Sequence, residues 1–350
     1  MFRIECLPAA HGDGIWIEWG TGSSAGRMLV DAGPAARYDE TVRARLATLP
    51  EGERHLDVFA VSHIDSDHID GAVLLLQDKA LGVSIGDVWF NGYQHLVDAA
   101  ERFGTFGPKQ GEFLAALLGG RRWNHALGGE PFVVPPTGKL PIIRGLPSGV
   151  SATLLSPGPQ ELIRLKQNWA STIAEAGWDP GAPDAALARL AQRKDMQPPM
   201  DLTFARSFGN DTAPATGSSM AFILEGGGKR VLLAGDAHAP VLTDGLKRYA
   251  TAKREPRVKL DLVKVAHHGS MANIDDALLA TIDCTRFAIS TSGAVFGHPD
   301  HETIELIART VPGATIYFNY RSDTTAPFEA RAASLGITVV YPPDGAAIDV

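Results

Sequence analysis

The residues that could carry chemistry are concentrated in one eight-residue segment that directly follows a short apolar run. This segment contains two histidines and three carboxylates, namely His63, Asp65, Asp67, His68 and Asp70. The first three recur at every second residue, so an extended backbone would present them on one side. Imidazole and carboxylate groups at this density suit one or two divalent cations. The segment therefore predicts a metal site.

Each of these side chains also has an ordinary structural interpretation. Asp67 or Asp70 could cap a helix that begins near Ile69. His63 could be a hydrogen-bonded histidine at the end of a strand. The cluster as a unit favours metal binding, because carboxylates this close repel one another unless a cation lies among them.

The segments on either side of the cluster predict how it is positioned. Val58–Val61 is an apolar run typical of a buried strand, and Ile69–Leu76 is typical of an apolar helix. In α/β proteins, functional groups commonly lie in the loop between a core strand and the following helix. The cluster occupies such a loop.

Three further apolar segments end in residue types that bind metals. One ends at Asp31, a second at Asp236 and a third at His267 and His268. If these strands share a sheet with the strand before the cluster, their ends meet at one edge. Each ending alone is weak evidence, whereas all of them together with the cluster predict a dispersed metal site.

Length and composition predict a large globular protein. The chain has 350 residues, of which 45% are hydrophobic, so it can bury an extensive core. Its net charge of −8 argues against a surface that coats a polyanion, but is compatible with a locally cationic, metal-loaded cleft. Cys6 and Cys284 lie far apart and are expected to be reduced, which favours a cytoplasmic protein. We expect no signal peptide and no contact with a membrane.

Hydrophobic periodicity predicts alternating strands and helices on both sides of a central segment. Strands are expected at 2–7, 15–19, 27–33, 56–62, 83–90, 152–155, 219–225, 230–236, 260–266, 286–291, 315–320 and 337–341. Helices, besides the one after the cluster, are expected at 38–49, 96–103, 111–118, 159–176, 184–194, 274–282 and 301–311.

The central segment differs in pattern, because helices there alternate with Gly- and Pro-rich connectors. We expect residues 1–92 and 203–350 to form the main domain, and residues 93–202 to form an inserted helical lobe that provides one wall of the site. The basic residues of this lobe fit either a cationic rim of the site or a solvated surface, and they are Lys109, Arg121, Arg122, Lys139 and Arg144.

These motifs resemble those of the metallo-β-lactamase superfamily, which carries His-x-His-x-Asp-His after a core strand. The most similar branch is the one typified by the soluble domain of the competence protein ComEC. The matching motifs, in the right order, are Gly12-Asp13, Asp31-Ala32-Gly33, Ser62-His63-x-Asp65-x-Asp67-His68, Gly235-Asp236, Val263 to Ser270 and Gly297 to Pro299. The match covers about residues 1–92 and 203–345, so the central segment lies outside it.

The resemblance implies a fold and a cofactor. The fold would be an α/β fold of the αββα type, with two mixed sheets flanked by helices. Two divalent cations, Zn²⁺ or Mn²⁺, would lie at one edge of the sandwich. One would be bound by His63 and Asp65, and the other by Asp67 and His68, with Asp236 as the bridging carboxylate.

The resemblance also implies roles for residues around the cations. Either His267 or His268 would be the late histidine ligand. His268 is favoured because it precedes a glycine, and His267 would then face the substrate. Asp31 and Asp13 would orient ligands rather than bind the cations.

Two departures from the family pattern stand out. Asp65 replaces the second histidine of the cluster, which makes the site harder and more anionic. The third motif normally contributes a histidine, but Phe204–Met220 has none. The first cation position is therefore expected to be weaker, labile, or completed by water and substrate. The most obvious oxygen donors nearby are Asn210, Asp211, Ser218 and Ser219, and Ser219 is expected to contact substrate.

For catalysis, a water activated by the two cations would be the nucleophile, and Asp67 or Asp236 would orient it. His267, or His298 on its Gly-His-Pro turn, would serve the leaving group. His298 fits a structural turn equally well, and for His11 and His238 the structural interpretation is favoured.

The preferred function is a metal-dependent phosphodiesterase or nuclease, because a carboxylate-rich site suits phosphoryl oxygens and the similar branch is associated with that activity. The substrate would be nucleic acid or a nucleotide. Two alternatives stay open, namely hydrolysis of a carbonyl ester such as a lactone, thioester or β-lactam, and a metal-binding regulatory module with weak activity. The natural substrate and the oligomeric state do not follow from the sequence.

Overall fold

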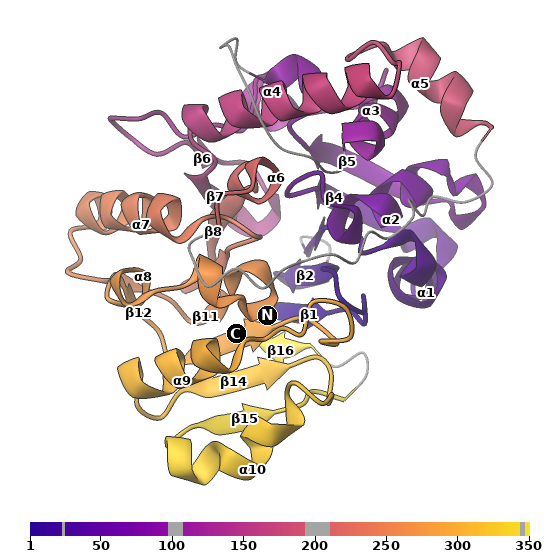
Figure 1. Cartoon of the computed structure of the whole chain (residues 1–350). Helices are drawn as coiled ribbons and strands as arrows, with labels where there is room; N and C mark the ends of the chain where they lie inside the picture. The colour runs from indigo at the N-terminus through magenta and orange to yellow at the C-terminus, as the bar shows by residue number, and fades with distance from the viewer. Residues whose placement is uncertain (23–24, 97–107, 193–210, 344–346) are drawn as a thin grey trace.

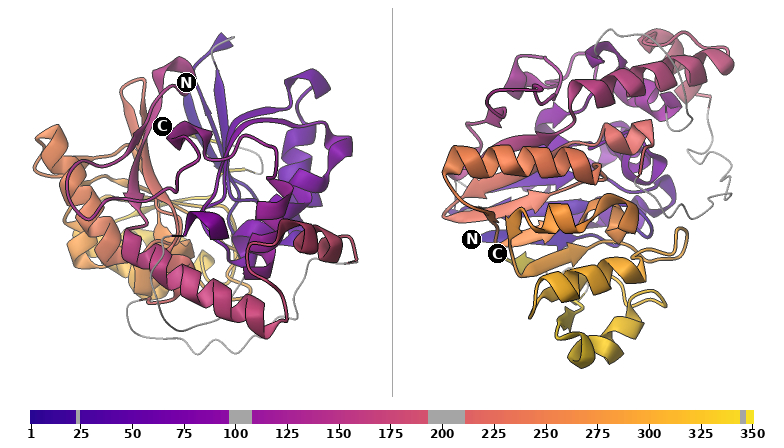
Figure 2. Two further views of the ribbon diagram at one scale, coloured as in Figure 1. Left: turned by 90° about the horizontal axis from the view of Figure 1, so that it is seen from above. Right: turned by 60° about the vertical axis from the view of Figure 1, so that its left-hand side comes forward.

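The computed structural model describes residues 1–22, 25–96, 108–192, 211–343 and 347–350. Within these ranges the chain forms two large β-sheets with helices on their outer faces (Figure 1). The N-terminal helices cover one side of the molecule and the helices of the C-terminal half cover the opposite side (Figure 2).

The first sheet has six strands in the order β16-β1-β2-β3-β4-β5. Their bounds are Phe2–Cys6 (β1), Ile15–Trp19 (β2), Gly26–Val30 (β3), His55–Ala60 (β4), Ser84–Trp89 (β5) and Ile348–Asp349 (β16). Strands β1, β2 and β3 pair antiparallel, whereas β3, β4 and β5 pair parallel. The parallel pairing of β3 and β4 brings the segments that follow them, with Asp31 and His63, to one edge.

The second sheet has eight strands in the order β15-β14-β13-β11-β9-β8-β7-β6. Their bounds are Ile142–Ile143 (β6), Ser151–Ser156 (β7), Ala221–Gly226 (β8), Lys229–Leu233 (β9), Leu262–Lys264 (β11), Arg286–Ile289 (β13), Thr315–Phe318 (β14) and Thr338–Val340 (β15). Strands β9 and β11 are parallel neighbours, so Asp236 and His267 follow strands that end at the same edge. A separate two-stranded sheet joins β10 (Val258–Lys259) to β12 (Ile282–Asp283).

Ten α-helices occur in the described residues. Their bounds are Ala44–Ala47 (α1), Ser66–Gln77 (α2), Pro108–Leu117 (α3), Pro159–Glu175 (α4), Pro183–Leu190 (α5), Pro214–Gly217 (α6), Ala239–Lys253 (α7), Asp276–Leu279 (α8), His301–Thr310 (α9) and Ala326–Leu335 (α10). A π-helical turn, Asp39–Arg43, leads into α1.

Three buried hydrophobic clusters define the layers. One contains inward residues of both large sheets, such as Ile17 of β2 and Phe222 of β8, and so lies between the sheets. A second packs the first sheet against α2, α3 and α4, and a third packs the second sheet against α7, α9 and α10. Strand β8 shows the underlying alternation, because Phe222 and Leu224 face the other sheet while Ile223 faces the helices. The predicted α/β sandwich of the αββα type is therefore confirmed.

The central segment contributes to both a helical layer and the second sheet. Helices α3, α4 and α5 pack against one another, and α3 also packs against α2. Strands β6 and β7, however, lie within the range expected to form the inserted lobe and belong to the second sheet. The division into a main domain and a lobe remains a prediction, but those two strands are part of the sandwich. The helix expected at 96–103 lies outside the described residues, apart from Leu96.

The structure also describes the two cysteines and the apolar character of the helices. Cys6 and Cys284 are free thiols, and Cys284 is buried. Among the helices of the described residues, none combines the length and the apolar character needed to cross a membrane.

Candidate metal centre

The residues singled out at the strand ends meet at one edge of the sandwich. His63 and His68 come from the segment between β4 and α2, Asp236 follows β9, and His267 and His268 follow β11. A backbone hydrogen bond from Met220 N to the Ser62 carbonyl oxygen, at 2.9 Å, ties the second sheet to the loop after β4. Another, from His267 N to the Gly235 carbonyl oxygen at 3.0 Å, joins the loops after β11 and β9.

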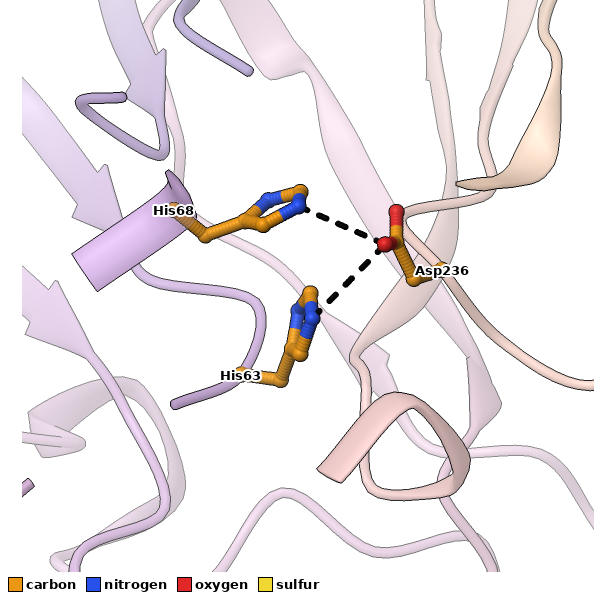
Figure 3. Close-up of side chains that lie close together, drawn as sticks. All are labelled: His63, His68 and Asp236. Atoms are coloured by element: carbon orange, nitrogen blue, oxygen red, sulfur yellow. Dashed lines mark ion pairs between the residues drawn. The ribbon is translucent and has the colours of Figure 1, made fainter. Parts of the chain in front are cut away.

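Asp236 lies at the centre of this cluster (Figure 3). Its Oδ2 is 3.3 Å from Nε2 of His68 and 3.7 Å from Nε2 of His63. The same oxygen is 3.7 Å from Nε2 of His267 and 3.9 Å from Nε2 of His268. Four imidazoles from two sheets thus point the same ring nitrogen at one buried carboxylate.

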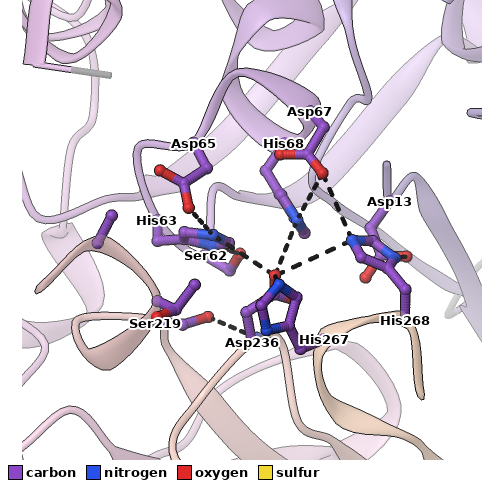
Figure 4. Close-up of polar contacts among 12 residues, drawn as sticks. Asp13, Ser62, His63, Asp65, Asp67, His68, Ser219, Asp236, His267 and His268 are labelled. Atoms are coloured by element: carbon purple, nitrogen blue, oxygen red, sulfur yellow. Dashed lines mark hydrogen bonds and ion pairs between the residues drawn. The ribbon is translucent and has the colours of Figure 1, made fainter. Parts of the chain in front are cut away.

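Two more carboxylates complete the cluster (Figure 4). Asp67 Oδ2 lies 3.8 Å from Nε2 of His68 and 3.5 Å from Nε2 of His268. Asp65 Oδ2 lies 3.3 Å from Nε2 of His63. All six residues predicted as metal ligands therefore lie in one place.

The opposite ring nitrogens of His63 and His68 are fixed by one carboxylate. His68 Nδ1 donates to Asp31 Oδ2 at 2.9 Å. The Ser62 hydroxyl donates to the same oxygen at 2.7 Å, so its own oxygen can accept from His63 Nδ1 at 2.9 Å. Because both Nδ1 atoms carry the proton in this arrangement, both Nε2 atoms present a lone pair to the cluster. Asp31 therefore contacts the outer ring nitrogen of His68 directly and that of His63 through Ser62.

The late histidines are held in the same way. His268 Nδ1 donates to the Ser290 carbonyl oxygen at 2.8 Å. His267 Nδ1 donates to Asn273 Oδ1 at 2.8 Å, while the Asn273 amide donates to the Asp236 carbonyl oxygen at 3.0 Å. Both histidines have positive φ, +46° and +54°. This left-handed backbone is unfavourable for such residues and turns both rings toward Asp236.

The unpaired atoms of the cluster are those that a cation would use. Within the described residues, Nε2 of His63, His68 and His268 and Oδ1 of Asp65 and Asp236 are buried without a hydrogen-bond partner. Buried polar atoms without partners are rare and costly. Imidazole nitrogens and carboxylate oxygens are also the donors that Zn²⁺ and Mn²⁺ accept. The residues present therefore fit divalent cations.

Charge supports the same conclusion. With His63, His68 and His268 neutral, as metal ligands must be, five carboxylates and one lysine leave four negative charges, which two divalent cations would balance. The five carboxylates are Asp13, Asp31, Asp65, Asp67 and Asp236, and the lysine is Lys264.

The histidines and carboxylates strongly shift the pKa values of one another. Burial would lower the pKa of His268, but Asp13 and Asp236 raise it to about 10. Burial would raise the pKa of Asp67, but His68 and His268 hold it well below its usual range. The pKa of Asp236 is lowered likewise, by His68, His267 and His268, against the effect of its burial. Protons and divalent cations therefore compete for the same nitrogen atoms.

A buried ion pair supports His268 from behind. Lys264 and Asp13 are both 2% exposed and their charged groups are in direct contact. Asp13 Oδ1 lies 3.4 Å from His268 Nδ1. Burial would lower the pKa of Lys264, but Asp13 and Asp236 raise it. Asp13, expected to orient a ligand, thus lies beside His268 in particular.

Two glycines allow the backbone to close around the cluster. A Cβ atom at Gly12 would lie 1.9 Å from the Asp67 carbonyl oxygen, and one at Gly71 would lie 2.0 Å from the Ala32 carbonyl oxygen. No other residue type fits at either position without moving the backbone. Gly12, in the turn between β1 and β2, is therefore a packing requirement of the site.

One local expectation was wrong. The helix after the cluster, α2, begins at Ser66 rather than near Ile69, with Asp65 at its N-cap. Asp67 and His68 consequently lie in the first helical turn, so His63, Asp65 and Asp67 do not share one side of an extended strand. Asp65 occupies the N-cap position without a capping hydrogen bond from its side chain, and Asp67 and Asp70 lie inside the helix.

Ser219 and His298, both expected to contact substrate, are placed differently from each other. Ser219 is fully buried, and its hydroxyl oxygen accepts a hydrogen bond from Asp236 N at 2.9 Å. It is therefore placed to hold the Asp236 backbone and not to contact substrate. His298 is partly exposed, and its ring centroid lies 5.6 Å from that of His267.

Asp211 has a more specific position than its sequence context indicated. Its Oδ2 lies 3.4 Å from His267 Nδ1 and accepts from the Asn273 amide at 3.1 Å, while its Oδ1 lies 3.7 Å from His238 Nε2. Sequence reasoning identified Asp211 only as one nearby oxygen donor and did not identify Asn273 or Lys264. A lysine inside an apolar strand was the available signal for Lys264. Asn210 lies outside the described residues.

Comparison with known proteins gives a weak likeness in structure alone. No protein-family model matches the chain, and no curated protein matches it. Zn²⁺-bound PqqB from Methylobacterium extorquens is similar at 15% identity, over 97% of this chain and 88% of PqqB, with a TM-score of 0.41. The short form of human tRNase Z is similar at 13% identity, over 100% and 99%, with a TM-score of 0.40. A CmlA β-hydroxylase variant is similar at 12% identity, over 99% and 54%, with a TM-score of 0.43.

Proposed function

We propose that the protein is a metal-dependent hydrolase of the metallo-β-lactamase superfamily, in its ComEC-like branch, and that it cleaves phosphodiesters. The observation that carries this proposal is the convergence of four imidazole Nε2 atoms on Asp236 Oδ2, at 3.3 to 3.9 Å. Each of these histidines is held at Nδ1, and three of them have an Nε2 atom without a hydrogen-bond partner. Such an arrangement is unfavourable in a protein interior unless it binds a cation.

Two cations, Zn²⁺ or Mn²⁺, would be held by the set His63, Asp65, Asp67, His68, Asp236 and His268. Bound there, they would acidify water and stabilise the negative charge that builds up on a phosphoryl oxygen. Asp67 and Asp236 keep low pKa values, so both remain hydrogen-bond acceptors at neutral pH and can orient the attacking water.

His267 would serve the leaving group rather than bind a cation. Among the described residues it belongs to no set of three converging ligand atoms, whereas His268 belongs to two. Its side chain is 26% exposed, compared with 1% for that of His268. Asn273 holds its Nδ1, so its Nε2 faces the region between Asp236 and solvent. A histidine in this position can donate a proton to the departing oxygen.

A phosphodiester is preferred over a carbonyl ester because of the carboxylates. Asp65 in place of a histidine makes the ligand set richer in oxygen, and hard oxygen ligands suit cations that also bind phosphate. The substrate would be nucleic acid or a nucleotide. A metal-binding regulatory module with weak activity is the second candidate, since Asp65 is the one predicted ligand that joins no converging set in the described chain.

The test is turnover with Zn²⁺ or Mn²⁺ on bis-p-nitrophenyl phosphate, single-stranded DNA and RNA, beside a lactone, a thioester and a β-lactam. Phosphodiester turnover that disappears in Asp236→Asn supports the proposal. Turnover of a carbonyl ester alone would overturn the phosphodiester assignment. A folded protein that binds metal but hydrolyses none of these substrates would instead identify the regulatory module.

A further inference from the structure

Two loops beside the metal-binding cluster carry a row of rings. The turn between β1 and β2 carries His11, and the connection between β13 and α9 carries Phe296 and His298. We term these three residues the ring row, and all of them are partly exposed. The row begins next to His267, whose ring centroid lies 5.6 Å from that of His298. It continues with centroid distances of 6.3 Å from His298 to Phe296 and 5.6 Å from Phe296 to His11.

Backbone hydrogen bonds fix the two loops relative to the cluster and to each other. Asp300 N donates to the carbonyl oxygen of Gly269, the residue directly after His268, at 3.0 Å. Ser292 N donates to the Ala10 carbonyl oxygen at 2.7 Å and so joins one loop to the other. The ring row therefore has a defined position beside the proposed leaving-group histidine.

The loop that carries Phe296 is held by contacts other than the phenyl ring. Gly297 N donates to the Gly293 carbonyl oxygen at 3.0 Å, which closes the loop on itself. The Thr324 hydroxyl donates to the His298 carbonyl oxygen at 2.9 Å and anchors the same turn from outside. The backbone thus sets the position of Phe296, and the ring keeps a partly exposed surface beside the site.

The composition of the two loops indicates which part of a substrate they suit. Residues 9–14 and 291–300 contain no lysine or arginine, so they lack the side chains that usually bind phosphate. They offer instead one phenyl ring between two imidazole rings. Aromatic side chains bind nucleobases by stacking, a contact that contributes a factor of about ten or more in affinity. The loops therefore suit a flat heterocycle that is attached to the phosphate rather than the phosphate itself.

We propose that the ring row binds the base of the nucleoside on the leaving-group side of the scissile phosphate, with Phe296 as the stacking surface. The choice of side rests on the proposed function, because His267, at the inner end of the row, would serve the leaving group. The preferred substrate is then a phosphodiester whose departing alcohol is a nucleoside, and a phosphodiester without a base on that side is a poor substrate.

A kinetic test compares a dinucleoside monophosphate with two analogues, in each of which a tetrahydrofuran residue replaces one nucleoside. The products identify the leaving side, and loss of the base on that side should lower kcat/KM of the wild type by about tenfold. Phe296→Ala should cause a similar fall with the complete dinucleotide and no further fall with that analogue. Phe296→Leu keeps the apolar bulk and should behave like Phe296→Ala, whereas Phe296→Tyr keeps the ring and should behave like the wild type. Equal effects of Phe296→Ala on the two substrates would overturn the inference.

Binding of adenosine, which has no phosphate, tests the ring row without turnover. With the Zn²⁺-loaded protein, saturation-transfer NMR should detect the base protons of adenosine on the wild type and on Phe296→Tyr, and lose them on Phe296→Ala and Phe296→Leu. Ribose, the matched probe without a base, should give no signal, and circular dichroism checks that each variant is folded. No base signal on the wild type, or an unchanged signal on Phe296→Ala, would overturn the inference. Base binding without phosphodiester turnover would refute the proposed function and leave the ring-binding site in place.

Discussion

Buried carboxylates occur in two very different settings in this molecule. At the edge of the sandwich, Asp67 and Asp236 face imidazole rings, and their pKa values are lowered although burial acts against this. In α3, Glu112 is as buried as Asp236, each being 2% exposed, but it accepts hydrogen bonds from the Trp169 indole at 2.8 Å and from Gly181 N at 2.9 and 3.0 Å. Burial outweighs these neutral donors and raises the pKa of Glu112.

The comparison separates a structural carboxylate from a functional one. Glu112 joins α3 to α4 through Trp169 and to the connection before α5 through Gly181. Both of these contacts are hydrogen bonds from neutral N–H groups. The carboxylates of the site repel one another unless a positive charge lies among them. Burial is therefore common to both settings, and they differ in the partners of the carboxylate, which are imidazole rings at the site and neutral N–H groups at Glu112.

The largest expected effect is that of Asp236→Asn, which removes the charge that both proposed cations would share. Metal content measured by elemental analysis should fall at both positions, and turnover of bis-p-nitrophenyl phosphate should fall by at least about 10²–10³-fold, as for loss of a central electrostatic group. Glu112→Gln is the matched control, since it neutralises an equally buried carboxylate far along the chain from the site. Equal losses in the two variants would remove the distinction between the settings.

Lys264→Met tests the buried ion pair between Lys264 and Asp13, in which a lysine already balances the charge of a carboxylate at the site. Removing Lys264 leaves the charge of Asp13 buried and unpaired, which should lower the free energy of unfolding by about 3–5 kcal/mol. Chemical denaturation measures this loss. The double variant Asp13→Leu/Lys264→Met should recover most of it, because an apolar pair of similar size has no buried charge. A single variant as stable as wild type would show that Asp13 is neutral in the folded protein.

Asp211→Asn should have a smaller effect, confined to catalysis. Asp211 contacts His267, which is proposed to serve the leaving group. We therefore expect kcat to fall by about tenfold, the lower end of losses for groups that orient a ligand or catalyst, with KM and metal content unchanged. Steady-state kinetics and elemental analysis provide the measurements. Ser218→Ala is the control, since it removes a buried hydroxyl nearby that donates to the Ala215 carbonyl oxygen at 2.6 Å and not to Asp211. A parallel fall in metal content would show that Asp211 supports the cation positions instead.

The part of the site that could be predicted from the sequence is the part encoded locally. The cluster from His63 to His68 and the strand endings at Asp31 and Asp236 stand out because polar ligand types interrupt apolar runs. The alternation of apolar residues likewise located most strands of both sheets. The start of α2 was placed too late because charged residues in a first helical turn resemble a loop.

The parts that could not be predicted depend on tertiary packing. Asp211 and Asn273 meet His267 only after the loops before α6 and after β11 fold together. Helix α7 was missed because Gly245 lies inside it, which is unfavourable for a helix in isolation. Pro240 lies in its first turn, where proline is compatible with a helix start. The structure explains Gly245, since a Cβ atom there would lie 2.9 Å from the Leu155 carbonyl oxygen of β7.

The smallest expected effect concerns Glu112, the carboxylate of the comparison that has only neutral hydrogen-bond donors. Its folded pKa lies above the usual value of 4.5. Its contribution to stability is therefore fully present below that value and is lost as the pH rises through the raised pKa. Relative to Glu112→Gln, the wild type should thus become less stable as the pH rises from below 4.5 through the raised pKa of Glu112, and this loss should be the smallest of the effects considered. Urea denaturation of both proteins across this range measures the difference, in which the titrations of all shared groups cancel. A difference that stays constant with pH would mean that Glu112 ionises as readily in the folded protein as in the unfolded chain. A difference that grows in favour of the wild type as the pH rises would mean that a cation outside its described contacts stabilises the ionised form.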